Sequence, residues 1–292
     1  MRDRHAAVPL GDWALVEMAS GEIVCVDTRT LEAIPYLLSA DHEADVIRVF
    51  RTFLRRGSVV LDIGANVGLY SAVAGRVVAE HGRLFAFEGN PQAFAALERT
   101  IVANGLFDNP RIVAANLLLS DSGGRGTLYY SADILAGGTM SDVPLLGGER
   151  RSVEVEMTTI DAYLPADLAV DLAKIDVEGH EPLVIRGMAR TIARSPNIRL
   201  IIEFVDHMLA HTVTAGEFID ELRAQGLEIC RVLPKFQLRL VPPGEAITGF
   251  NYLLLTRTAA ADIAAVEQRR RYPPLRFKRW LARHRPAWGR YG

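Results

Sequence analysis

Short apolar runs alternate along this chain with longer segments in which apolar residues recur every three or four positions. The short runs predict strands at residues 59–64, 83–88, 111–116, 171–176, 198–204, 227–232 and 251–256. The periodic segments predict helices at residues 67–79, 91–104, 181–193 and 215–225. Strands that alternate with helices pair in parallel, in a sheet with helices on both faces. The last strand is entered from a loop, so we expect an α/β fold with a seven-stranded, Rossmann-like sheet whose last strand is reversed.

The pattern divides the chain into parts. Residues 1–56 predict a cap made of a β-hairpin, Trp13–Met18 with Ile23–Asp27, and a helix at Asp41–Leu54. Residues 57–258 then form the main domain. Together these parts make one mid-sized enzyme domain with modest extensions.

A glycine-rich segment interrupts the regular alternation at residues 120–151. A long segment of this kind inside a domain predicts either a mobile loop that covers substrate or a tolerated surface insertion. Ser152 to Met157 beyond it predicts a further strand, with Val153 and Val155 on one side.

Composition narrows the class of protein. The chain has 292 residues, of which 49% are hydrophobic, and this is enough to bury a substantial core. Cys25 and Cys230 form no CxxC pair, which argues against a disulfide framework and a cysteine zinc site. No apolar run reaches the roughly 20 residues of a membrane span, and the first residues lack the apolar centre of a signal peptide. We therefore expect a cytoplasmic protein.

The formal net charge of −2 is unevenly distributed. Residues 259–292 are interpreted as a basic tail, because nine Arg or Lys and no acid occur from Arg269 onward. Within it, basic residues between 276 and 285 alternate with Leu275, Phe277, Trp280 and Leu281. This pattern predicts either an amphipathic helix for an anionic membrane surface or a solvated terminus.

A glycine turn follows the first strand of the main domain. A dinucleotide-binding turn needs glycine at its first, third and sixth positions so that a pyrophosphate fits, and here those positions hold Gly64, Asn66 and Leu69. Glu88 ends the next strand, where an acid can accept both hydroxyls of a ribose. A nucleoside without a diphosphate suits this turn, and S-adenosylmethionine fits that description. The alternative is a tight strand-to-helix turn that binds no ligand.

Three motifs together resemble the FkbM family of S-adenosylmethionine-dependent methyltransferases. They are Leu61-Asp62-Ile63-Gly64-Ala65-Asn66-Val67-Gly68, Thr159-Ile160-Asp161 and Lys174-Ile175-Asp176-Val177-Glu178-Gly179. The resemblance covers roughly residues 57 to 256 and implies the methyltransferase variant of the predicted sheet. It also implies cofactor contacts at Asp62, Gly64, Asn66, Gly68 and Glu88. We add Ala65, Tyr70, Ser71, Asn116 and Asp176 to this predicted set.

The expected methyl acceptor is a hydroxyl group. Methyltransferases that act on amino groups of nucleic acid bases carry Pro-Pro-aromatic after the fourth strand, where this chain has Asp176-Val177-Glu178-Gly179. Neither cysteine is placed for carbon methylation of cytosine, and the folded part is acidic, so we expect no nucleic acid partner. The resemblance implies O-methylation, here of a glycan or a small hydroxylated metabolite. The alternatives are a nicotinamide-dependent reductase and a non-catalytic, cofactor-binding scaffold at a membrane.

Carboxylates are the candidates for catalysis. Asp176 and Glu178 follow one predicted strand and Glu203 ends its neighbour, so the three are expected to meet above the cofactor. They predict a site for Mg²⁺ or another divalent cation, a direct general base, or caps for the next helix.

Two histidines are further candidates for the general base. We expect the pKa of His180 to rise beside carboxylates, which makes His207 the better base candidate. Lys174, inside the strand motif, is expected to be structural. The acceptor and the oligomeric state are not determined by these patterns.

Overall fold

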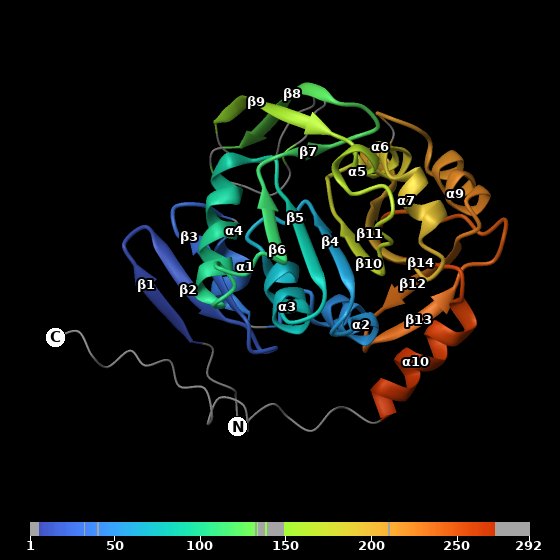
Figure 1. Cartoon of the computed structure of the whole chain (residues 1–292), viewed down its shortest axis with the longest axis horizontal. Coiled ribbons are helices and arrows are strands. Elements are labelled where there is room, and N and C mark those ends of the chain that lie inside the picture. The colour runs from blue at the N-terminus through green and yellow to red at the C-terminus, as the bar shows by residue number, and fades with distance from the viewer. Residues whose placement is uncertain are drawn as a thin grey trace.

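An eight-stranded sheet forms the centre of the computed structural model, which describes residues 6–31, 33–39, 41–131, 133, 138, 149–209 and 211–271 (Figure 1). Its strands are β4 (Val59–Ile63), β5 (Arg83–Phe87), β6 (Ile112–Ala115), β10 (Leu172–Ile175), β11 (Arg199–Val205), β12 (Glu228–Leu233), β13 (Gln237–Leu240) and β14 (Phe250–Thr256). They lie in the order β13-β12-β14-β11-β10-β4-β5-β6.

The strand directions confirm the predicted fold class. Strands β6, β5, β4, β10 and β11 are parallel, and β14 pairs antiparallel with both β11 and β12. The seven predicted strands therefore form a Rossmann-like sheet with the last strand reversed. Strand β13 is an eighth, unpredicted strand at the edge, where it pairs antiparallel with β12.

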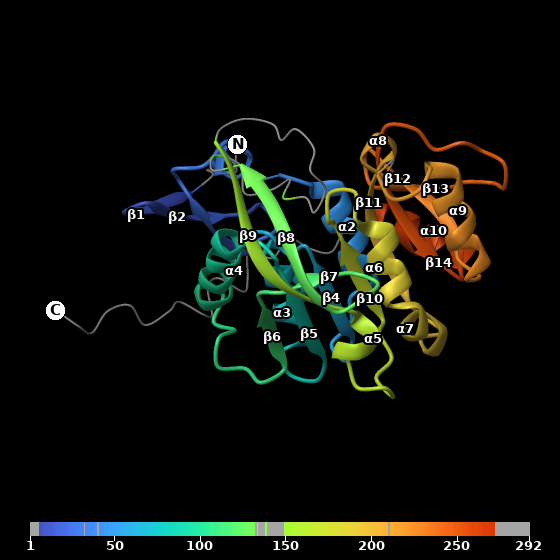
Figure 2. The ribbon, with the colours of Figure 1, turned by 90° about the horizontal axis from the view of Figure 1, so that it is seen from above.

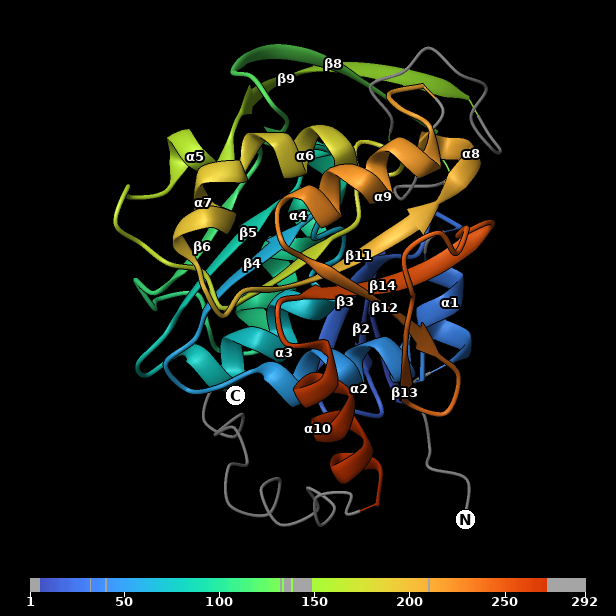
Figure 3. The ribbon, with the colours of Figure 1, turned by 90° about the vertical axis from the view of Figure 1, so that its right-hand side faces the viewer.

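Helices cover both faces of the sheet, as Figure 3 shows. One face carries α5 (Ile160–Tyr163), α6 (Glu181–Gly187), α7 (Ala189–Arg194) and α9 (Ala215–Ala224), and the short α8 (Asp206–Leu209) follows β11. The other carries α2 (Ala44–Phe53), α3 (Leu69–Val78), α4 (Pro91–Ala103) and α10 (Ala259–Arg271). Each face buries its own apolar cluster against the sheet, so the central strands are inaccessible from both sides.

The helix predicted at 181–193 is interrupted. Met188, with φ −121°, separates α6 from α7. Gly187 at the end of α6 lies so close to the neighbouring loop that an added Cβ would be 1.9 Å from the carbonyl oxygen of Ser120. Tertiary packing therefore determines this break, which apolar periodicity does not reveal.

The predicted cap is present and larger than expected. Strands β2 (Trp13–Glu17) and β3 (Ile23–Asp27) form the predicted hairpin, β1 (Ala7–Leu10) adds a third strand, and α1 (Ala33–Leu38) precedes α2. In α2, Phe50 is fully buried and its ring lies 5.2 Å from that of Tyr70 in α3. The cap therefore shares a hydrophobic core with the main domain.

The glycine-rich segment begins as a strand. Residues Gly124–Ser131 form β8, which pairs antiparallel with β9 (Arg150–Thr158), and the short β7 (Leu118–Leu119) pairs with β9 in parallel. The prediction of a loop over 120–151 is therefore wrong at 124–131, and residues 134–137 and 139–148 lie outside the described residues. Figure 2 shows β8 and β9 as a long ribbon beside the main sheet, so the predicted strand at 152–157 does not belong to that sheet.

The start of the predicted tail is a packed helix. In α10, Val266 is fully buried, and the Asp262 carboxylate accepts a 2.6 Å hydrogen bond from Nη2 of Arg199. The amphipathic helix predicted between 275 and 285 lies outside the described residues. Among the helices that the structure describes, none combines the length and the apolar character needed to cross a membrane.

Candidate functional site

The site lies where the strand order reverses. The chain continues from β4 to β5 on one side, whereas β10 lies on the other side of β4. At the carboxyl ends of these strands, the Asp176 amide donates a 3.0 Å hydrogen bond to the carbonyl of Ile63. Ligands of open α/β sheets bind at such a switch point.

Gly64 permits the two strand ends to approach each other. Its φ is +72°, and an added Cβ would lie 1.8 Å from the carbonyl oxygen of Asp176. The sequence predicted that this glycine brings backbone close to a ligand. In the structure, the backbone of Gly64 lies closest to the backbone of the turn after β10, at Asp176. Both turns border the same cavity.

A cavity of about 340 Å³ opens at this point. Its size lies within the range of small-molecule sites, roughly 300 to 1,000 Å³. The predicted site residues that line it are Gly64, Asn66, Glu88, Asp176, Glu178, His180 and Glu203. The tertiary structure thus brings together both halves of the predicted site, the glycine turn and the carboxylates.

Backbone amides hold the Glu88 carboxylate in place. Oε2 accepts from the amide of Asn66 at 2.8 Å, and Oε1 accepts from the amide of Asn90 at 2.7 Å. Burial raises the pKa of Glu88 to about 7, although both amides act to lower it. Each oxygen keeps a further lone pair, so the carboxylate can still accept hydrogen bonds from a diol.

Six of the predicted cofactor residues are absent from the cavity lining, and five of them support the site from behind. Ser71 donates a 2.5 Å hydrogen bond to Asp62, and burial raises the pKa of this aspartate to about 6. Asn116 donates to the carbonyl of Glu88 at 2.7 Å. Tyr70 donates to Glu43 at 2.6 Å. An added Cβ on Gly68 would lie 2.7 Å from Leu97, so this glycine is required for helix packing.

Ala65, the remaining predicted cofactor residue outside the lining, is also buried. Its side chain packs with Ala86 and Leu97 in a small apolar cluster. It therefore contributes packing between β5, α4 and the glycine turn.

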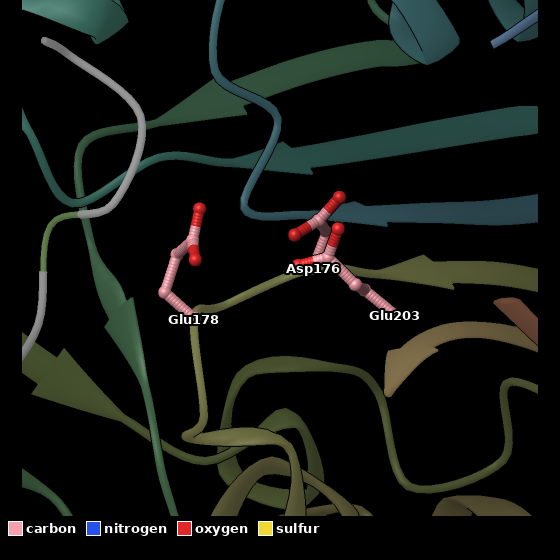
Figure 4. Close-up of side chains that lie close together, drawn as sticks. All are labelled: Asp176, Glu178 and Glu203. Atoms are coloured by element: carbon pink, nitrogen blue, oxygen red, sulfur yellow. The ribbon is translucent and has the colours of Figure 1, made fainter. Parts of the chain in front are cut away.

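Three carboxylates meet at the carboxyl ends of β10 and β11, as predicted. One oxygen each from Asp176, Glu178 and Glu203 lies within 4.8 Å of the others (Figure 4). Burial and the neighbouring charges of Asp176 and Glu178 raise the pKa of Glu203 far above its usual value. Carboxylates this close cannot all ionise without a compensating charge, so the cluster holds a proton or a cation at neutral pH.

Lys174 supplies one positive charge to this cluster. Its ammonium is 2.6 Å from Oδ2 of Asp176, and its side chain is 1% exposed. Burial lowers its pKa, but Asp176 and Glu43 outweigh that effect and the net shift is upward. The ammonium also lies 5.1 Å from the ring centre of Tyr70 and 5.2 Å from that of Tyr252. Lys174 is therefore part of the site's electrostatics.

The turn after β10 is shaped by a buried acid. Glu178 and Gly179 both have positive φ, 54° and 93°, so the chain reverses sharply and the Glu178 side chain reaches the cavity. Oε1 of Glu181 accepts from the amides of Val177 at 3.0 Å and Gly179 at 3.4 Å. Burial raises the pKa of Glu181 to about 7.

The two candidate histidines have different environments. His180 lines the cavity, and its Nε2 lies 3.0 Å from Oγ of Ser120. The predicted rise of its pKa is wrong: burial lowers it, and Asp121 only partly offsets this effect. His207 is 79% exposed and pairs with the adjacent Asp206, so the structure does not bring it to the cavity lining.

Several contributors were not predicted from the sequence. Glu43 of the cap accepts hydrogen bonds from Tyr70 at 2.6 Å and from Tyr252 at 2.8 Å, and it lines the cavity with Tyr36 and His42. Tyr36, His42 and Glu43 lie close together in the cap but far along the chain from Tyr252, and they form no motif. Glu181 lies two residues after the motif that ends at Gly179, and the sequence patterns predicted no role for it. The one signal in the sequence for this role is that an acid comes shortly after the turn residues Glu178 and Gly179.

The sequence matches the methyltransferase FkbM domain over residues 62–229, which is more than half of the chain. The chain belongs to this family. The match begins at Asp62 in β4 and includes every strand end that borders the cavity except β14. The family resemblance seen in the three motifs is thereby confirmed.

A curated relative and two solved structures are similar at lower levels. The hexuronic acid methyltransferase AglP of Haloferax volcanii is 26% identical over 187 residues, which cover 61% of this chain and 70% of AglP. An S-adenosylmethionine-dependent O-methyltransferase from Thermotoga maritima is 12% identical, with TM-score 0.42 over 86% of this chain and 85% of that chain. Precorrin-6y C5,15-methyltransferase from Geobacter metallireducens is 14% identical, with TM-score 0.41 over 75% and 89%. Structural similarity at this level says nothing about the acceptor.

Proposed function

We propose that this FkbM methyltransferase transfers a methyl group from S-adenosylmethionine to a hydroxyl of a glycan or a small hydroxylated metabolite. One observation carries the proposal: Glu88 and the carboxylate cluster around Asp176 line the same cavity at the switch point of the sheet. The Glu88 carboxylate suits the hydroxyls of a ribose, and the carboxylate cluster suits removal of the proton from an acceptor hydroxyl.

Glu88 supports a nucleoside donor. Its carboxylate is fixed by two amides at the end of β5, in the position where an acid accepts the two ribose hydroxyls in this type of sheet. The turn at Gly64 lacks the glycines that a pyrophosphate requires, which disfavours a nicotinamide cofactor. S-adenosylmethionine, which has no phosphate, is the donor that fits both features.

The acceptor proton must be removed as the methyl group is transferred. A bond forms between the acceptor oxygen and the methyl carbon, while the bond from that carbon to the sulfonium sulfur breaks. The products are a methyl ether, S-adenosylhomocysteine and a proton on the protein. Among the catalytic candidates, Asp176 is ion-paired with Lys174, and burial together with like charges raises the pKa of Glu203 and so favours its neutral form. Glu178 and His180 are therefore the proposed bases. Such a base contributes roughly 10² to 10⁴-fold to the rate.

A divalent cation is the second way to manage the proton. Three carboxylate oxygens within 4.8 Å form a donor set of the kind that Mg²⁺ and similar ions prefer. Asp176, Glu178 and Glu203 would hold the ion, which would supply Lewis acidity that lowers the pKa of the acceptor hydroxyl. Lys174 competes with the ion for Asp176, so we favour direct proton transfer.

Binding of S-adenosylhomocysteine tests the donor site. Calorimetry on the full chain should show binding, and Glu88→Ala should weaken it by about 10 to 100-fold, the cost of losing hydrogen bonds to a charged group. Glu267→Gln, at an exposed position of α10, is the matched control and should bind normally. Saturable binding of NADH without binding of S-adenosylhomocysteine would favour the alternative of a nicotinamide-dependent reductase.

Methyl transfer tests the catalytic residues. With radiolabelled S-adenosylmethionine and a cell extract as acceptor source, Glu178→Gln should lower the rate at least 100-fold while S-adenosylhomocysteine still binds. His180→Gln, compared in the same assay, decides which of the two is the base. If a chelator removes all transfer and Mg²⁺ restores it, the cation mechanism replaces the proposed one.

We also propose that residues 272–292 bind anionic membrane surfaces, because the basic and aromatic pattern of the sequence supports this. The chain shortened after Arg271 should lose sedimentation with vesicles containing anionic lipid, while the whole chain sediments with them. Equal sedimentation of both forms would exclude the tail as the contact. A scaffold without catalysis would show this membrane binding together with cofactor binding and no methyl transfer.

A further inference from the structure

The cavity wall is rich in carboxyl groups. Among the described residues that line it, five carry a carboxyl group, and none of the described lining residues is an arginine or a lysine. The five are Glu43, Glu88, Asp176, Glu178 and Glu203.

The basic side chains at the cavity include Lys174 and two lining histidines, His42 and His180. Lys174 lies behind the wall, 1% exposed, with its ammonium directed at Asp176 between the rings of Tyr70 and Tyr252. A bound sulfonium would add a second positive charge. With Asp176 paired to Lys174, the carboxyl groups of Glu43, Glu178 and Glu88 remain on the wall, and burial raises the pKa of Glu88 to about 7.

Aromatic residues border the acidic wall on the side of β14. Phe250 is 63% exposed and lines the cavity, and its ring packs edge-on against Tyr252 at 5.2 Å. The hydroxyl of Tyr252 donates to Glu43 at 2.8 Å, which places this carboxylate beside the aromatic pair. A ring with hydroxyl donors and no negative charge can contact both kinds of surface.

We infer that the acceptor is a neutral or cationic hydroxyl compound, and that an anionic sugar is excluded by the charge of the cavity wall. This inference rests on the proposed function and specifies the acceptor class of the same site. Carboxylates accept hydrogen bonds from hydroxyl or ammonium groups, whereas a partner of like charge in a half-buried cavity is disfavoured. The chain therefore differs in acceptor charge from its relative named as a hexuronic acid methyltransferase, with which it shares 26% identity.

Labelling of a cell extract tests the inference. The full chain is incubated with radiolabelled S-adenosylmethionine and the extract, ester label is removed with mild base, and the products are hydrolysed to their monomers. An anion exchanger then separates acidic monomers from the rest. We expect at least ten times more label in the unretained fraction than in the acidic one. Label mainly in the acidic fraction overturns the inference and leaves the proposed function intact.

A charge variant makes the same test sharper. Glu43→Gln removes one negative charge from the wall without altering either proposed base, so it should raise the acidic share of the label several-fold. Glu267→Gln on exposed α10 is the control and should leave that share unchanged. An unchanged share in Glu43→Gln contradicts charge exclusion. Absence of any base-stable label, with S-adenosylhomocysteine still bound, contradicts the proposed methylation of a hydroxyl and the inference with it.

Discussion

Single residues of this site combine structural and chemical roles, and Glu88 is the clearest case. Two amides fix its carboxylate at 2.8 and 2.7 Å, and burial raises its pKa to about 7. The same side chain thus shapes the turn around Asn66 and offers oxygens to the proposed ribose. Because ribose hydroxyls donate to the ionised form, donor binding and deprotonation of Glu88 are linked.

This linkage predicts a pH dependence of donor binding. The carboxylate binds the ribose and the protonated acid binds it less well, so affinity should be full above pH 7. It should then fall by up to about tenfold per pH unit below the pKa of Glu88. Calorimetric titrations with S-adenosylhomocysteine between pH 5.5 and 8.5 measure this fall. Glu88→Gln should bind weakly with little pH dependence, and a variant that keeps the wild-type slope would assign the effect to another group.

At the scale of elements, the turn from β10 to α6 depends on a buried acid. Glu181 is 2% exposed, accepts two amides of the turn and has a pKa raised to about 7. The unfolded chain releases this proton near the usual glutamate pKa, whereas the folded chain holds it until about pH 7. The folded state therefore binds more protons in this window, and Glu181 lowers stability as pH rises through it.

The variant Glu181→Gln tests whether Glu181 lowers the stability of the fold as the pH rises. Glutamine keeps an acceptor oxygen for the two amides and has no charge, so the free energy of unfolding should fall less between pH 5 and 8 than in the wild type. Urea unfolding at a series of pH values measures the difference. A steeper fall in the variant would contradict a raised pKa for Glu181.

The close contact between the turn that follows β4 and the turn that follows β10 leads to a second prediction about the elements of the fold. Gly64→Ala forces a side chain into a positive φ and against the Asp176 carbonyl, so it should destabilise the fold by more than about 2 kcal/mol. Gly57→Ala is the matched control, because an added Cβ there meets nothing within 4 Å. Denaturant unfolding compares the two, and equal stabilities would show that the turns move apart without cost.

For the whole molecule, the cap and the sheet form one unit that shares a core and a cavity. Cap residues such as Val46 and Phe50 belong to the same apolar cluster as Val73 of α3 and Leu254 of β14. Glu43 connects the cap to Tyr70 and Tyr252. A cap that contributes both to the core and to the cavity wall should not unfold separately.

Cooperative unfolding is therefore expected. Trp13 of the cap lies with its ring 4.1 Å from the Arg99 guanidinium, so its fluorescence should report on the cap. In a chain with Trp280→Phe and Trp288→Phe, this fluorescence and far-ultraviolet circular dichroism should give coincident transitions in urea. An earlier fluorescence transition would mean that the cap is an independent domain.

Local patterns in the sequence predicted the order of the main elements, the reversed last strand, and the residues at the strand ends. Apolar runs and helical periodicity are local signals, so Gly64, Glu88 and Asp176 could be placed directly after strands and Glu203 near the end of another. Parallel strands then bring those ends to one edge of the sheet. The carboxylate cluster and the acid of the proposed ribose site were accordingly predictable.

The surroundings of these site residues depend on the tertiary structure. It placed Asp62, Ala65, Gly68, Tyr70, Ser71 and Asn116 behind the cavity wall, and His207 on the surface. It also brought Glu43 and Tyr252 together with Lys174 and reversed the expected pKa shift of His180. These outcomes depend on contacts between distant segments and on burial. Both arise only when segments that are distant in the chain pack together.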